Sequence, residues 1–102
     1  MKLYCISDNI DTRIGMRLAG VEGCVVHEKE EVLRAFRAVC ADESIGIVLI
    51  TSKLIELCYT EIYDYKLHHR LPLITEIPDR HGETDIGANI ARYLNEAIGV
   101  SL

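Results

Sequence analysis

The sequence of 102 residues contains no tryptophan, one phenylalanine and two prolines, and it is short of basic residues. Its 11 lysines and arginines are outnumbered by 16 aspartates and glutamates, which leaves a net charge of −5. Nucleic acids and anionic lipids are bound largely through positive charge, so this balance argues against both as partners. The longest apolar runs are far shorter than the roughly 18 to 20 residues of a membrane helix, and the N-terminus lacks the apolar core of a signal peptide. We therefore expect a soluble, cytoplasmic protein that does not insert into the membrane.

The sequence also lacks a Cys-x-x-Cys pair. Each of its four cysteines lies alone inside an apolar stretch, at Cys5, Cys24, Cys40 and Cys58. This spacing argues against a zinc ribbon and against a redox dithiol. Buried, reduced thiols are the expected state. Apolar surroundings raise the pKa of a thiol, so neither Cys5 nor Cys58 is expected to act as a nucleophile.

Phosphate-binding loops and clustered histidines are absent from the sequence as well. Neither G-x-G-x-x-G nor G-x-x-x-x-G-K-[ST] occurs. No two histidines are four residues apart, which predicts that all four lie at the surface: His27, His68, His69 and His81. The sequence therefore predicts no metal, no nucleotide or other cofactor, and no catalytic set of residues.

The composition, with 49% hydrophobic and 26% charged residues, is that of one globular domain spanning residues 1–102. Short apolar runs alternate with segments of helical periodicity. Strands are predicted at 2–7, 23–26, 45–50 and 71–77, and helices at 10–18, 28–40, a short stretch after Thr51-Ser52, and 83–98. Residues 59–70 are compatible with a helix or a loop. This order predicts an α/β fold, a doubly wound four-stranded parallel sheet in order 2-1-3-4 with helices on both faces and a C-terminal helix.

Two strands have features that place them in this sheet. The run from Ile45 to Ile50 is apolar at nearly every position, which is typical of a strand covered on both faces. Pro72 stands near the start of the last predicted strand and lacks an N–H group. We therefore expect the third strand in the centre of the sheet and the fourth at an edge.

Open parallel sheets bind ligands at the switch point, beyond the carboxyl ends of the first and third strands. Several polar residues should gather there, namely Asp8, Asn9, Asp11, Thr12, Thr51, Ser52 and Lys53. Asp8, Thr51 and Lys53 suggest the phospho-acceptor site of a receiver domain, but Ile50-Thr51 stands where that site needs its acceptor carboxylate. The favoured interpretation is that Asp8 and Thr51 cap helices.

The last two segments offer a contact surface. Arg80 and His81, in the loop 78–82, could hold an anion, although a simple turn is favoured by the residue types of this loop. In the last helix, apolar side chains cover an arc of about 160°, more than the roughly 100° that seats a helix on its own core. The arc contains Ile86, Ile90, Ala91, Tyr93, Leu94, Ala97 and Ile98. The candidate partner-binding residues are Ile86, Ile90, Tyr93 and Ala97. They are separated by 4, 3 and 4 positions, which is the a/d spacing of a coiled-coil seam.

Three blocks, in this order and spacing, resemble the F subunit of the V-type rotary ATPases, also called A/V-type ATP synthases. The first reads SDNIDTRIGMRLAG over 7–20, where a strand runs into an acidic turn followed by Thr12, Gly15 and Leu18-Ala19-Gly20. The others are IGIVLIT over 45–51 and LPLITEIP over 71–78. The chain departs from the family at Ser7, where the family usually has glycine, and at Met16, where the family often has a bulkier residue. The short tail after Gly99 is similar to that of the prokaryotic branch.

The resemblance implies a noncatalytic rotor subunit of the central stalk. Such a subunit binds the coiled coil of the D subunit and rotates with it, while the A and B subunits hydrolyse or make ATP. It also implies a C-terminal helix that contributes to stalk contacts. The alternatives that remain from the residues alone are a receiver-like signalling or protein-interaction domain without a phospho-acceptor Asp, and a small α/β enzyme.

Overall fold

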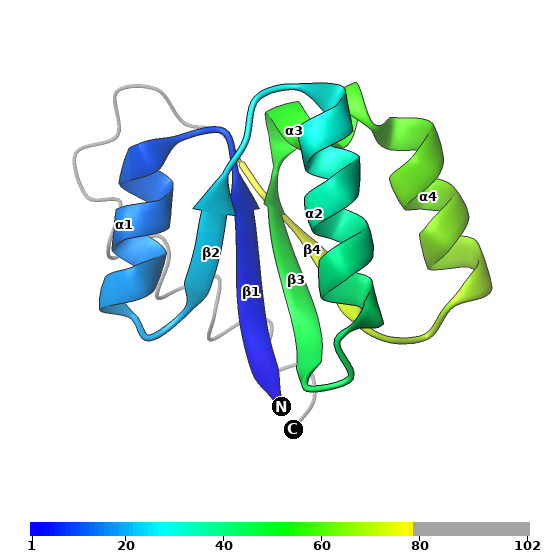
Figure 1. The fold of residues 1–102 in the computed structure, drawn as a ribbon, viewed down its shortest axis with the longest axis horizontal. Coiled ribbons are helices and arrows are strands. Elements are labelled where there is room, and N and C mark those ends of the chain that lie inside the picture. Colours follow the sequence, from blue (N-terminus) through cyan, green and yellow to red (C-terminus); the bar gives the residue numbers. More distant parts are fainter. Residues whose placement is uncertain (79–102) are drawn as a thin grey trace.

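Residues 1–78 are described by a computed structural model, in which strands and helices alternate along the chain (Figure 1). The elements are β1 (Lys2–Ser7), α1 (Ile10–Leu18), β2 (Glu22–Val25), α2 (Lys29–Ala41), β3 (Ile45–Thr51), α3 (Ser52–Leu57), α4 (Tyr59–His68) and β4 (Leu73–Ile77). The four strands form a sheet in the order β2-β1-β3-β4, and every neighbouring pair is parallel. The predicted fold class and strand order are confirmed, and the predicted C-terminal helix lies outside the described residues.

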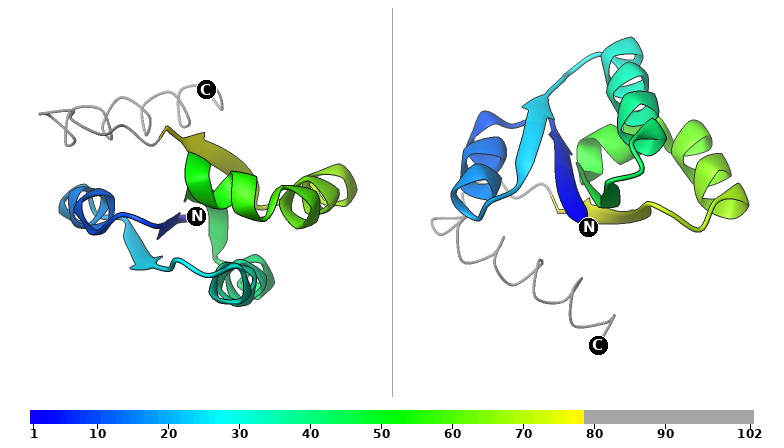
Figure 2. Two further views of the ribbon diagram at one scale, coloured as in Figure 1. Left: turned by 90° about the horizontal axis from the view of Figure 1, so that it is seen from above. Right: turned by 60° about the horizontal axis from the view of Figure 1, so that its bottom comes forward.

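Helices cover both faces of the sheet. The view from above shows α1 on one side and the other three helices on the opposite side (Figure 2). Two apolar clusters correspond to these faces. The smaller joins Met16 of α1 to Cys5 and Leu49 of the sheet, and the larger joins Phe36 of α2 and Ile62 of α4 to other strand residues. This division makes the sheet doubly wound within the described part of the chain.

Strand β3 is central, as its continuous apolar run predicts. All seven of its residues are buried. Val48 and Ile50 point into the cluster beneath α2, α3 and α4, whereas Ile47 and Leu49 belong to the cluster beneath α1. Because alternate side chains of a strand point to opposite faces, only a strand covered on both sides is apolar at every position.

Local sequence accounts for the ends of the first helices. The side chain of Asn9 accepts hydrogen bonds from the backbone N–H groups of Asp11 and Thr12, which begins α1. At the other end Gly20 adopts φ +87°, a left-handed conformation that glycine takes without strain. Glu28 and Glu31 form a capping box at the start of α2.

Strand β4 begins at Leu73, two residues later than predicted and directly after Pro72, and it is an edge strand as expected. The ambiguous stretch after Cys58 is a helix, α4. No helix in the part of the chain that the structure describes has the length and apolar character needed to span a membrane. Cys5 and Cys58 are buried, Cys24 and Cys40 are partly buried, and all four are free thiols.

Candidate functional site

The turn after β1 and the junction of β3 with α3 lie next to each other at the carboxyl edge of the sheet, because these two strands are hydrogen-bonded neighbours. This edge is the switch point of the strand order. The Thr51 hydroxyl donates a hydrogen bond to Oδ1 of Asp8 at 2.8 Å, and the backbone N–H of Asp8 donates to the same hydroxyl at 3.3 Å. The side chain of Thr51 is almost fully buried. Asp8 and Thr51 therefore join the turn after β1 to the end of β3.

The prediction that Asp8 and Thr51 cap helices with their side chains is wrong. Asn9, one residue later than Asp8, caps α1. Thr51 occupies the N-cap position of α3 but makes no capping hydrogen bond with its side chain. Ser7 fixes the turn instead, since its hydroxyl donates to the Asn9 carbonyl at 2.8 Å and accepts from the Asn9 N–H at 2.9 Å. The hydrogen-bond partner of the Asp8 side chain is thus Thr51 at the end of β3, and not a backbone N–H group of helix α1.

The remaining predicted residues of this edge have separate roles. Asp11 and Thr12 lie in the first turn of α1, where their backbone N–H groups donate to Asn9. The Ser52 hydroxyl donates to the carbonyl of Ile77 at 3.1 Å, which ties α3 to the end of β4. The structure therefore brings Asp8, Thr51 and Lys53 to one place, while Ser52 faces the edge strand.

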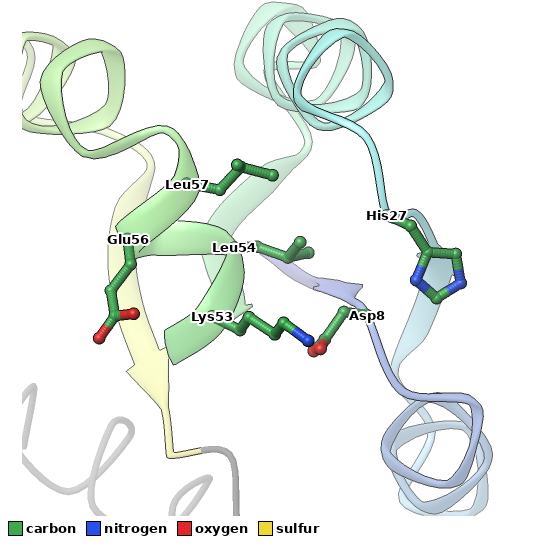
Figure 3. Close-up of a pocket in the computed structure, with 6 residues that line it drawn as sticks. All are labelled: Asp8, His27, Lys53, Leu54, Glu56 and Leu57. Carbon is green, nitrogen blue, oxygen red and sulfur yellow. The ribbon is translucent and has the colours of Figure 1, made fainter.

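A pocket of about 410 Å³ opens at the switch point. It is lined by Asp8, His27, Lys53, Leu54, Glu56 and Leu57. The side chain of Lys53 extends toward the Asp8 carboxylate, whereas Glu56 and His27 lie at opposite sides of the opening (Figure 3). Sequence reasoning did not assign His27 or Glu56 to this site. The strand order could have indicated His27, because it places the end of β2 beside that of β1.

Among the described residues, the lining of the pocket contains no serine, threonine or cysteine side chain and therefore no hydroxyl or thiol nucleophile. No cluster of three or more His, Cys, Asp or Glu side chains that could hold a metal ion occurs among residues 1–78. The position of a receiver's acceptor aspartate is taken by Thr51, whose hydroxyl is already bound to Asp8. The receiver interpretation therefore lacks its acceptor.

The thiols of this part of the chain are also poor nucleophiles. Burial raises the pKa of the Cys5 thiol to about 12, with the nearby Cys24 adding to the effect. Burial likewise raises the pKa of Cys58, and the Glu61 carboxylate raises it further. Because the thiolate is the reactive form, neither cysteine is activated for catalysis.

We expect calorimetric titration of the protein with ATP or ADP to give no binding signal. The lining of the switch-point pocket has no glycine-rich loop, and it includes the carboxylates of Asp8 and Glu56, which repel phosphate. Binding tighter than about 10 µM, which corresponds to about 6.8 kcal/mol, would contradict this interpretation of the pocket. The same titration after Lys53→Ala would then tell whether the pocket is responsible.

The candidate partner-binding residues from the sequence, Arg80, His81, Ile86, Ile90, Tyr93 and Ala97, lie outside the described residues. The structure therefore does not test them.

Comparison with known proteins identifies the family. The family model described as "ATP synthase (F/14-kDa) subunit" matches residues 3–94. The F subunit of the A-type ATP synthase of Methanocaldococcus jannaschii is 34% identical over 103 residues, covering 100% of this chain and 99% of that protein. Those of Thermococcus kodakarensis and Pyrococcus furiosus are each 34% identical, covering 100% of this chain and 98% of the relative. The chain thus belongs to the ATP synthase (F/14-kDa) subunit family and is a subunit, not itself catalytic, of a rotary ATP synthase.

Proposed function

We propose that this chain is a rotor subunit of the central stalk that binds the coiled-coil D subunit and rotates with it. In this role it helps to couple ATP hydrolysis or synthesis to rotation and ion transport. It reaches the A and B subunits of the catalytic head through the D subunit, on the cytoplasmic side of the membrane. The observation that carries the proposal is the match to the F subunits of A-type ATP synthases over the full length of the chain.

The last segment of the sequence supports a helical partner. Ile86, Ile90, Tyr93 and Ala97 follow the 4, 3, 4 spacing of a coiled-coil seam. The apolar arc of about 160° is wider than a helix needs for packing on its own domain. In the proposed arrangement these four residues face the D subunit, while Leu94 and Ile98 lean toward the domain's own sheet. Arg80 and His81, in the preceding loop, are the next candidates for contact.

We expect Tyr93→Ala to weaken binding to the purified D subunit by about 1 to 3 kcal/mol, since tyrosine is among the side chains enriched at interface hot spots. Leu94→Ala is the matched comparison, because truncation of a core leucine costs about 2 to 5 kcal/mol of stability. Tyr93→Ala should lower the stability of the free protein by less than Leu94→Ala does. Thermal melting of the free variants and titration with the D subunit measure the two effects separately.

Two results would count against this proposal. If the wild-type chain neither binds nor co-purifies with the D subunit, the stalk function itself is wrong. If the wild type binds but Tyr93→Ala destabilises the free chain as much as Leu94→Ala and leaves the affinity unchanged, only the seam assignment is wrong. The contact would then be sought at Arg80 and His81.

A further inference from the structure

One face of the sheet is only partly covered by the helices that the structure describes. Helices α2, α3 and α4 all lie on the opposite face (Figure 2). On this face α1 is the only helix among residues 1–78, and it packs against β1 and β2. The other half of the face belongs to β3 and β4, which present Ile47, Leu49 and Ile77 there. These three residues are hereafter the β3–β4 patch.

The β3–β4 patch crosses both strands. In the parallel register Ile47 stands beside Leu73, and Thr51 stands beside Ile77. Register partners in neighbouring strands point to the same face, so the patch runs from Ile47 near the amino end of the sheet, through Leu49, to Ile77 at the carboxyl end. Each of the three patch residues is at most 5% exposed. Buried apolar side chains on a sheet face require a second layer of structure over them.

The rest of the chain begins where it can supply this layer. The last strand, β4, ends at Ile77 on the carboxyl edge of the sheet, and residues 79–102 follow. On the opposite face the space beside β4 is already taken, because Leu54 of α3 and Ile62 of α4 belong to the apolar cluster that Ile74 of β4 joins. The Ser52 hydroxyl also ties α3 to the Ile77 carbonyl at 3.1 Å. A helix that follows β4 therefore has room only on the face of the β3–β4 patch.

The lengths of the remaining segments match the sheet. The loop 78–82 falls within the usual two to six residues of a connection between elements. A helix over 83–98 would be about 24 Å long at 1.5 Å per residue. The seven residues of β3 span about 23 Å at 3.3 Å per residue. A helix that returns antiparallel to β4 would therefore cover the whole patch, from Ile77 to Ile47, without extending far beyond the sheet.

The predicted last helix has one narrow side whose residues suit this position. With successive residues 100° apart, Ala91, Leu94 and Ile98 fall within about 60° of one another. Gly87 lies in the same sector, so this side is small near the start of the helix and large near its end. Tyr93 lies about 100° from Leu94, outside the sector. The helix can therefore pack on the sheet through one side and offer another side, with Tyr93, to a different contact.

We propose that the β3–β4 patch is the docking site for the last helix of the same chain, which lies on the patch through Leu94 and Ile98. This contact completes the second layer on the face that α1 covers only in part. It also fixes the rotation of the helix about its own axis, and so selects the side with Tyr93 for the D subunit. The docking rests on connectivity and packing alone, and only its consequence for the D subunit rests on the proposed stalk function.

The first test uses the full wild-type chain, labelled at the methyl groups of isoleucine and leucine, in solution NMR. We expect nuclear Overhauser contacts from the methyl groups of Leu94 and Ile98 to those of Ile47 and Leu49. The methyl groups of Leu18, which is 85% exposed on α1, are the control and should give no contact with the patch. Absence of contacts between the last helix and the patch would overturn the docking. Contacts seen only between differently labelled chains would assign the patch to a second copy and overturn it as well.

The second test compares amide hydrogen exchange in the double variant Leu94→Gln/Ile98→Gln and in the matched control Tyr93→Gln. Glutamine keeps the helix propensity and removes the apolar or aromatic side chain. We expect the double variant to exchange the β4 amides at least tenfold faster than the wild type, because loss of the covering layer lets the edge strand open more often. The control should stay within about twofold of the wild type. Equal exchange in all three proteins would contradict the docking.

The two proposals fail separately. If the double variant does not fold, the methyl contacts of the wild type still decide the docking. Titration of the wild type with the purified D subunit decides the stalk function, since a chain that shows the methyl contacts but does not bind the D subunit keeps the docking and loses the stalk function. A chain that binds the D subunit without the methyl contacts keeps the stalk function and loses the docking.

Discussion

Leu49→Asp should abolish cooperative folding. Leu49 is fully buried in the middle of the central strand β3, where its register partners are Cys5 of β1 and Thr75 of β4. Its side chain lies in the cluster with Met16 and offers a carboxylate no partner. An unpaired buried charge costs several kcal/mol, against a total stability of about 5 to 15 kcal/mol for a protein of this kind. Ile47→Asp, on the same face of the strand, should have the same effect.

Circular dichroism and thermal melting of the purified variants would measure this effect. The matched control is Leu73→Asp, because Leu73 is the β4 partner of Ile47 in the sheet but is 51% exposed on the edge strand. We expect Leu73→Asp to fold and to melt cooperatively. Soluble, cooperatively melting Leu49→Asp and Ile47→Asp variants would show that β3 is not covered on both faces.

Phe36→Ala should be the most destabilising truncation in the layer formed by α2, α3 and α4. The Phe36 ring is buried and meets the Tyr65 ring of α4 edge to face, with centroids 5.3 Å apart. Truncating a buried phenylalanine to alanine costs about 3 to 5 kcal/mol, because the cavity left behind closes only in part. This residue is the only phenylalanine of the chain, and it joins α2 to α4 over the sheet.

Urea unfolding of Phe36→Ala, Tyr65→Leu and the double variant would separate burial from the ring contact. An edge-to-face pair contributes about 0.5 to 1.5 kcal/mol beyond burial, which the double-mutant cycle measures directly. Arg34→Ala is the control on the exposed side of α2 and should change stability by less than about 0.5 kcal/mol. A loss below about 1 kcal/mol for Phe36→Ala would contradict the packing of α4 against α2.

The sequence pattern predicted the central strand and helix α2 well, because both depend on where apolar side chains recur. The run from Ile45 to Ile50 is buried throughout, and Val32, Phe36 and Val39 are the buried face of α2. Helix α4 was ambiguous for a physical reason. Its aromatic and apolar residues lie on both sides, with Ile62 buried and Tyr63 exposed, so no single apolar face marks it in the sequence.

The candidate site was predicted less completely. The sequence placed Asp8, Thr51 and Lys53 at one edge of the sheet, which follows from the alternation of strands and helices. It assigned Asp8 and Thr51 to helix capping, because each stands where a cap is expected. The hydrogen bond between them joins residues 43 positions apart, and a local pattern carries no information about such a pair.

The sequence by itself determined the fold class, the order of the strands in the sheet and the central position of β3, since apolar periodicity and chain connectivity limit a domain of this size to few arrangements. Only the tertiary structure decided which side of each element meets which neighbour. Ile10, Ile14 and Leu18 have the spacing of a buried face, yet they are exposed, because α1 packs against the sheet through Met16. Periodicity shows that a helix has an apolar side, but packing determines whether that side covers the domain's own sheet or is left for a partner.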